Sequence, residues 1–326
     1  RYKHKNMSVI LGRQLLNTPF INLQDGRMRP TGVEGAWVEY NDTKKIKAAG
    51  GLLYAVSPRG TTKWFHIGES VGVYPSGVNV DGTKSQYNNN VSSKIVALLG
   101  LNFKASKNLN LQVWDVYTDN VFNTAMLQAD LLFPQKNSSS FFAAIQFIRQ
   151  HAINLGGNTN AAKTYFEKNG RSFSFGARAG WKNKTWETSI NYNRITGHGR
   201  YLMPREWGRE PFFTFLPRER NEGFGDVHAI MARVNFNIPK AGIKTSLAAG
   251  YYKLPDVKNY RLNKYGLPSY TQANADIRYS FTGILKGFEA QLLVVWKMNA
   301  GEMYNNRRFE INKVNMLQYN FVLNFH

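Results

Sequence analysis

The chain has 326 residues and a formal net charge of +21, and it contains no cysteine, which excludes disulfides and thiolate metal sites. Its mean hydropathy is −0.42 although 14% of its residues are aromatic, an unusual pairing for a soluble enzyme. No apolar run approaches the roughly 18 residues that a transmembrane helix needs. A transmembrane β-barrel stays possible, because each of its strands needs only about 9–11 residues of alternating polarity.

Alternation of apolar and polar residues is the dominant pattern of the chain. It indicates β-strands, because apolar positions in a helix recur every three or four residues. One strand is expected to end near Gln14 and the next to start near Val33. The clearest segment is QANADIRYSF, in which every second residue is apolar or aromatic. The pattern predicts strands at 94–104, 172–181, 186–193, 228–238, 272–281, 288–298 and 317–325.

The predicted strands are joined by two kinds of connection. Short, turn-like segments lie at 104–108, 182–184, 239–242 and 285–287. Long polar segments lie at 17–32, 75–91, 152–171, 195–225 and 254–270. Short turns on one rim and long loops on the other are typical of outer-membrane barrels, and the spacing predicts about 14 antiparallel strands in a single domain.

A soluble sandwich or lipocalin-like barrel is the alternative, because its strands also alternate, with the apolar face turned inward. Two features favour the membrane barrel. The polar faces carry small neutral residues with single arginines or lysines, as a water-filled lumen would. Aromatic residues gather near the expected strand ends, as interfacial girdles do: Trp181, Trp186, Tyr192, Tyr251, Tyr252, Trp296 and Tyr319.

Three blocks of sequence, 10–37, 204–226 and 300–325, resemble the OprD-type family of outer-membrane porins, in the form found among Bacteroidetes-type sequences. The resemblance implies an all-β barrel of 18 strands, monomeric or loosely trimeric, whose lumen is narrowed by an inward-folded loop and lined by a ladder of basic residues. It also implies small substrates that often bear a carboxylate. Members of the family carry several strands ahead of the first block. We therefore expect 1–326 to be one barrel domain without its N-terminal strands, since an incomplete barrel cannot close its edges in lipid.

Basic residues on the polar strand faces are the first candidates for contact with a solute. Arg178 and Arg278 lie on such faces. Each is also compatible with a solvated or salt-bridged lumen residue, and Asp276 lies close enough along the strand to neutralise Arg278 in part. Further candidates on expected strands are Lys94, Lys104 and Arg233.

The segment 200–222 combines five arginines with four glutamates, a near balance that suggests internal ion pairs. It fits either a self-paired extracellular loop or a loop that faces the pore. Its central PFFTF, residues 211–215, suggests packing against the lumen wall or another loop. The pore-lining candidates of this segment are Arg205, Arg209, Arg218 and Arg220.

The segment QDGRMRPTG, residues 24–32, adds Arg27 and Arg29, with Asp25 as a local partner. Without the family resemblance, this segment would be interpreted as a solvated turn. The family resemblance places it where the constriction loop folds into the pore, and we expect at least one of the two arginines to face the permeation path.

Other functions find little support in the sequence. Basic residues are spread singly along the chain rather than gathered in a patch or helix, which argues against nucleic-acid binding. No GxSxG, Walker, GxGxxG or HExxH motif occurs, so we predict no enzyme, cofactor or metal site. The sequence predicts a passive porin of a Gram-negative outer membrane that contacts lipid and lipopolysaccharide and admits small anions through a basic constriction. The alternative is a structural or accessory barrel of a larger envelope assembly.

Overall fold

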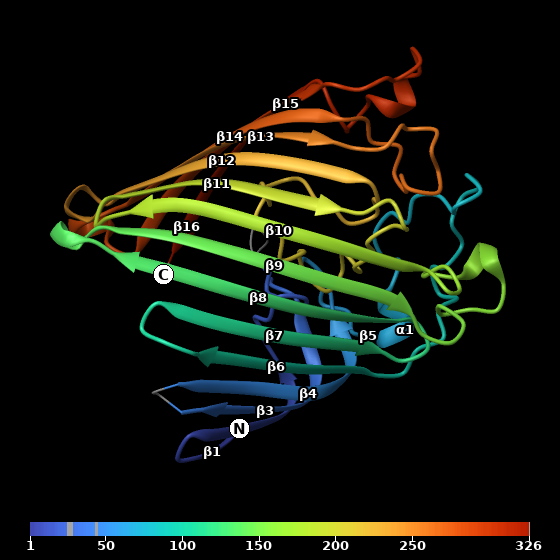
Figure 1. The fold of residues 1–326 in the computed structure, drawn as a ribbon, viewed down its shortest axis with the longest axis horizontal. Coiled ribbons are helices and arrows are strands. Elements are labelled where there is room, and N and C mark those ends of the chain that lie inside the picture. Colours follow the sequence, from blue (N-terminus) through green and yellow to red (C-terminus); the bar gives the residue numbers. More distant parts are fainter. Residues whose placement is uncertain (25–28, 43–44, 326) are drawn as a thin grey trace.

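The computed structural model describes residues 1–24, 29–42 and 45–325, whose strands form one antiparallel sheet in which neighbours follow the order of the chain (Figure 1). β5 pairs with β4 alone and lies off this path. Within the described residues, β1 pairs with β2 and β16 with β15. The strands are β1 Tyr2–His4, β2 Met7–Gln14, β3 Gly32–Asn41, β4 Ile46–Ser57, β5 Phe65–His66, β6 Val96–Lys104, β7 Leu109–Thr118, β8 Phe122–Pro134, β9 Ser140–Ala152, β10 Arg171–Lys182, β11 Trp186–Ile195, β12 Val227–Ile238, β13 Ile243–Lys253, β14 Tyr270–Ser280, β15 Phe288–Asn299 and β16 Met316–Phe325.

The long connections lie on one rim of the sheet, at the right of Figure 1, and the opposite rim at the left has short turns. The connection 119–121 between β7 and β8 is short and lies on the long rim. The short rim includes turns with residues at positive φ, such as Asn137 and Gly242, where asparagine and glycine are tolerated best. The other rim carries the long connections 15–31, 58–95, 153–170, 196–226, 254–269 and 300–315. The predicted asymmetry is therefore confirmed, and 300–315 is a long connection that the sequence analysis did not identify.

Helices are few and short among the described residues. The α-helix α1, Ile67–Ser70, has four residues, and the 3₁₀ segments η1 to η5 have three each. They lie at Lys136–Ser138, Ala161–Lys163, Pro239–Ala241, Gly283–Leu285 and Arg307–Phe309. In the part of the chain that the structure describes, no helix has both the length and the apolar character needed to cross a membrane.

The outward face of the strands is mainly apolar, and the inward face carries many buried polar side chains together with some apolar ones, such as Ile148 and Met231. Ile145 and Ile190 are 67% and 64% exposed in mid-strand. By contrast, Gln150, Ser174 and Asn193 are at most 1% exposed. A soluble sandwich would show the reverse, because its core excludes water and attracts apolar groups. The pattern fits a barrel with lipid outside and a polar lumen, and it excludes the soluble alternative.

The predicted strands agree with the structure to within two residues at every end, and fourteen strands have eight residues or more. The described residues hold 16 strands in all, against the eighteen that the family resemblance implies. The aromatic prediction is wrong for Tyr252, which is 1% exposed and faces inward, stacked on Tyr270 at 4.6 Å. Its neighbour Tyr251 is 40% exposed. Consecutive residues of a strand point to opposite faces, so the two tyrosines cannot share one girdle.

Candidate functional site

The connection 196–226, which we call the inner loop, crosses the interior of the curved sheet. On one side, Gln150 of β9 accepts a hydrogen bond from the Leu202 amide at 2.9 Å and donates one to its carbonyl at 2.7 Å. On the other side, Gln272 of β14 donates to the Pro217 carbonyl at 2.9 Å. The inner loop is thus fixed to two distant strands, and the expected inward-folded loop is present.

Its sequence explains why this loop turns inward. Trp207, Phe212 and Leu216 are at most 4% exposed, so the loop brings its own apolar core into a polar interior. Pro211 and Pro217 have no N–H group to donate to a strand ladder, which keeps this part of the loop irregular and leaves their carbonyls to accept bonds from side chains. Glutamine side chains of the wall bind them instead, through Gln146 to Pro211 at 3.1 Å and Gln272 to Pro217.

Three arginines gather where the inner loop meets β10 and β12. Arg233 of β12 donates to the Phe215 carbonyl at 2.6 Å and lies close enough to Arg178 and Arg209 to be affected by both charges. The loop's aromatic rings separate them: Phe213 lies 4.7 Å from the Arg178 guanidinium and Phe215 lies 4.9 Å from that of Arg209. We call Arg178, Arg209 and Arg233 the basic cluster. Arg178 forms an ion pair with Asp130, and among the described residues no carboxylate forms an ion pair with Arg209 or Arg233.

That ion pair spans 2.9 Å and neutralises the cluster only in part. Phe213 approaches β10 at Gly176, where a Cβ atom would lie 3.2 Å from the ring, so a larger residue there would press on the loop. Arg209 itself is exposed, and its guanidinium lies over the ring of Phe215. The cluster therefore offers an accessible positive charge at the wall of the interior.

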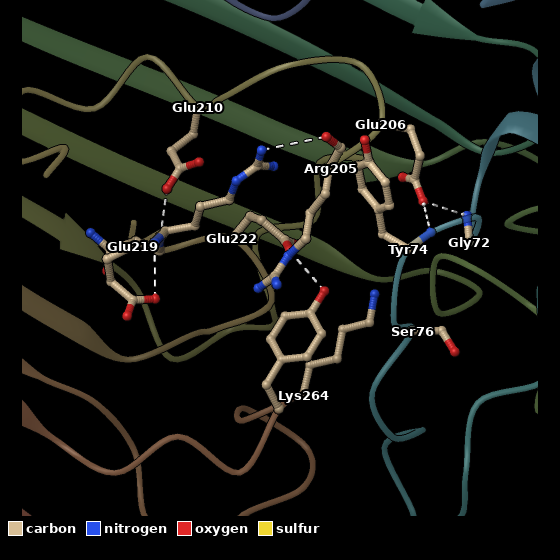
Figure 2. A network of polar contacts seen from close by, with 12 residues as sticks. Gly72, Tyr74, Ser76, Arg205, Glu206, Glu210, Glu219, Glu222 and Lys264 are labelled. Carbon is tan, nitrogen blue, oxygen red and sulfur yellow. Dashed lines mark hydrogen bonds and ion pairs between the residues drawn. The ribbon is translucent and has the colours of Figure 1, made fainter. Parts of the chain in front are cut away.

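A second group of charges is buried between the inner loop and its neighbours (Figure 2). Arg205 forms an ion pair with Glu222, which also accepts a hydrogen bond from Tyr265 at 2.7 Å. Glu206 accepts bonds from the backbone amides of Gly72 and Tyr74. With Arg220, Lys264 and Glu210, the network holds three cations and three carboxylates, so it adds little net charge.

The pKa shifts in this network follow from burial and from its pairing. Burial raises the pKa of Glu206 and of Glu210 above the usual range. Burial alone would also raise the pKa of Glu222, but the positive charges of Arg205 and Lys264 outweigh the effect of burial, so the pKa of Glu222 is lowered. Burial lowers the pKa of Lys264 to about 8, with the attraction of Glu222 and Glu206 acting against the repulsion of Arg200 and Arg205.

The structure separates the predicted site residues into several groups. Arg178 and Arg209 belong to the basic cluster, while Arg205 and Arg220 belong to the buried network. Arg278 of β14 pairs with Asp276 at 3.2 Å, as expected, and with Glu289 at 3.7 Å.

The remaining predicted residues lie apart from the basic cluster. Arg218 donates to Asn320 of β16 at 2.5 Å. The Arg29 carbonyl accepts a hydrogen bond from the Gly60 amide at 3.0 Å, and Arg27 lies outside the described residues. Lys94 and Lys104 are exposed.

The described part of 17–32 also enters the interior, at one point. Asn22 donates to the Arg209 carbonyl at 2.9 Å, and its own amide donates to the carbonyl of Trp207. The inner loop forms the hydrogen bonds to both β9 and β14, and the described part of 17–32 contacts that loop. Buried Lys264 escaped the sequence analysis, because nothing in its polar segment distinguishes it from a solvated lysine.

Comparison with known proteins places the chain in one family. Residues 1–210 match the model of the outer membrane porin, OprD family. Among solved structures, Pseudomonas aeruginosa OpdK with vanillate superposes with a TM-score of 0.76 at 10% identity, over 98% of this chain and 75% of that one. Acinetobacter baumannii OccAB2 gives 0.74 at 14% identity, over 99% and 74%. P. aeruginosa OccK3 (OpdO) gives 0.69 at 14%, over 90% and 71%.

No curated protein sequence matches the chain. The family match covers well over half of the chain, and the solved structures share its fold. The outward apolar faces and the loop that crosses the interior agree with that assignment. The chain belongs to the OprD family of outer membrane porins, and it is accordingly a β-barrel channel for small solutes in the outer membrane of a Gram-negative bacterium.

Proposed function

We propose that the channel is selective for small anions, above all solutes that bear a carboxylate, and that the basic cluster beside the inner loop is its selectivity element. The observation that carries this proposal is the convergence of Arg178, Arg209 and Arg233 from two strands and the inner loop. Asp130 is the carboxylate that pairs directly with one of them, at 2.9 Å. The cluster therefore keeps a net positive charge where the loop narrows the interior.

A positive cluster in a wall of low dielectric constant concentrates anions and repels cations. Guanidinium groups suit a carboxylate because their paired N–H donors match its two oxygens. Passage requires each contact to be weak enough to release the solute. The exposure of Arg209 and its stacking on Phe215, rather than on a carboxylate, meet that requirement.

Two further facts support the choice of solute. The whole chain carries a formal charge of +21, which favours anionic partners over cationic ones. The similar structure of OpdK contains vanillate, an aromatic carboxylate. The alternative proposal, a structural or accessory barrel of a larger assembly, predicts a protein that conducts poorly by itself.

Reversal potentials across planar bilayers in a potassium chloride gradient test the proposal. We expect anion selectivity in the unmodified chain, a clear loss of it in Arg209→Gln and in Arg178→Gln, and no change in Lys240→Gln. Lys240 is a matched control because it is exposed in a turn on the short rim. Cation selectivity of the unmodified chain would overturn the anion proposal, and absence of conductance would favour the accessory barrel.

A further inference from the structure

Basic side chains occupy one end of the outward face of β9 to β13, five strands that lie side by side in the sheet (Figure 1). Residues an even number of positions apart in a strand share a face, so the exposed Ile145 and Ile190 identify the outward positions of β9 and β11. Counted in this way, the outward face carries four cations, each within four residues of the strand end that meets a long connection. We call them the outer basic patch: Arg149, Arg171, Arg194 and Lys253.

Two of these arginines stand close together without a counter-ion. Arg171 lies opposite His151 in the pairing of β10 with β9, and Arg149 is two residues before His151. Residues in such diagonal positions are about 7–8 Å apart, within reach of long side chains. Both arginines are exposed, and neither forms an ion pair with a carboxylate of the described residues. Their mutual repulsion falls when both guanidinium groups bind one external anion.

The other two cations lie on the neighbouring strands. Arg194 of β11 is opposite His228 of β12, which is opposite Lys253 of β13. Asp226 pairs with Arg194 at 2.6 Å, whereas Lys253 is exposed and has no ion pair within the part of the chain that the structure describes. Four cations against this one paired carboxylate leave the patch a net charge of +3. The patch therefore attracts anions to the outward face of the sheet, away from the interior.

Apolar rings lie directly beside the patch, nearer the middle of the strands. Phe147 precedes Arg149 by two residues and Phe173 follows Arg171 by two, so each ring shares the outward face of its arginine. The Phe147 ring lies 6.3 Å from that of Phe173 and 5.1 Å from that of Phe175. Phe175 is 49% exposed. Cations at the edge of an apolar surface suit a molecule that joins a phosphate head group to acyl chains.

The opposite end of the same five strands differs. From their middle to the short rim, their described residues place no charged side chain on the outward face, and four of the strands end in aromatic rings: Phe141, Trp181, Trp186 and Phe236. Long connections face the outside of the cell in outer-membrane barrels, so the patch lies at the outer leaflet. In a Gram-negative bacterium the main lipid of that leaflet is lipopolysaccharide, whose lipid A anchor carries phosphate groups on a body of acyl chains.

We propose that the outer basic patch binds the lipid A phosphates of lipopolysaccharide. Arg149 and Arg171 hold one phosphate between them, because guanidinium groups supply paired N–H donors to its oxygens. Lys253 extends the positive surface to a neighbouring phosphate, and the acyl chains lie against the phenylalanine rings. The contact anchors the barrel in the outer leaflet. It goes beyond the proposed anion selectivity, which depends on residues of the interior.

Native mass spectrometry of the purified full chain in detergent tests the proposal, with EDTA present so that no divalent cation bridges lipid and protein. The probes are lipid A with two phosphates, lipid A with one, phosphatidylglycerol and inorganic phosphate. We expect the first to bind about tenfold or more tightly than each of the other lipids, since it brings the most negative charge to the patch. Equally tight binding of phosphatidylglycerol would overturn the proposal in favour of a general preference for acidic lipids. Displacement of lipid A by millimolar inorganic phosphate would overturn it in favour of a free-anion site.

Variants locate the contact. Arg149→Gln with Arg171→Gln should weaken lipid A binding about tenfold or more, and the charge-preserving Arg149→Lys with Arg171→Lys should weaken it less. Because both arginines are exposed and lack ion pairs within the described residues, these variants are expected to fold. The matched control, Lys184→Gln with Lys240→Gln, removes the same charge from two exposed turns of the short rim. Unchanged binding in the glutamine pair would refute the contact. An equal loss in the control would also refute it, because the attraction would then come from the overall charge of the chain.

The two proposals fail separately. Arg149→Gln with Arg171→Gln is expected to keep the reversal potential of the unmodified chain, since both side chains face outward. Arg209→Gln is expected to change the reversal potential and to bind lipid A as tightly as before. Unchanged lipid A binding in the glutamine pair would refute the outer basic patch while leaving the anion selectivity of the channel intact.

Discussion

Gln150→Leu should release one side of the inner loop. The Gln150 side chain forms two hydrogen bonds with the backbone of Leu202 and a third with Thr124 at 2.7 Å. Both Gln150 and Leu202 are buried, at 1% and 5% exposed. Leucine preserves the approximate size of the side chain but cannot donate or accept, so the amide and carbonyl of Leu202 lose their partners.

The expected magnitude follows from those two groups. Each buried backbone group left unpaired costs about 1–3 kcal/mol, so the closed position of the loop loses at least about 2 kcal/mol. Since about 1.4 kcal/mol corresponds to a tenfold change in an equilibrium constant, local opening should become about thirtyfold more frequent. The same release should raise the noise and the mean size of single-channel currents, because the loop crosses the interior between β9 and β14.

Amide hydrogen exchange of inner-loop peptides, with the chain in detergent, measures the effect directly. The matched control is Gln291→Leu, which removes a glutamine of β15 that bonds to Asp276 at 3.0 Å. That bond joins residues of two neighbouring strands, β14 and β15, and does not involve the inner loop. Exchange within 196–226 that is equally fast in Gln150→Leu, Gln291→Leu and the unmodified chain would refute the reasoning.

Three further predictions concern stability. Glu219→Gln should lower the free energy of urea unfolding by about 3–5 kcal/mol, because it leaves the buried Lys297 ammonium, 4% exposed, without its carboxylate partner. Adding Lys297→Met should restore part of that loss. Ile190→Arg should cost about 2–4 kcal/mol in lipid vesicles, while Ser189→Arg on the opposite face should cost far less; equal costs would contradict the lipid-facing assignment. The pKa of Lys264 falls from 10.5 to about 8 on folding, so the unfolded chain binds more protons between those values; the free energy of unfolding should rise with pH across that window, and less so in Lys264→Met.

Much of the fold could be predicted because strand alternation specifies both the element and the face. The segment 172–181 shows this: its phenylalanines point outward and Ser172 and Ser174 are 1% exposed. The same rule explains the error at Tyr252, since a cluster of aromatics along the sequence conceals their opposite directions. The sequence also predicted most of the long connections, but it did not predict the one at 300–315.

The site was predictable only in part. The composition of 200–222 indicated ion pairs, and Arg205 and Glu222 form one. It could not decide between an extracellular and an inward loop, because that choice depends on partners such as Gln150, 52 positions from Leu202 in the chain. Likewise, the convergence of Arg178 and Arg209 depends on tertiary packing, which periodicity does not encode.

Single-cysteine labelling tests the central claim most directly, and the chain has no native cysteine to interfere. In open channels, Arg209→Cys should react with water-soluble methanethiosulfonate reagents; a cationic reagent should restore anion selectivity and an anionic one should lower it further. Phe175→Cys, whose side chain is 49% exposed on the outer face, should show no change in current. Unchanged current and selectivity in Arg209→Cys under both reagents would contradict a permeation path lined by the basic cluster.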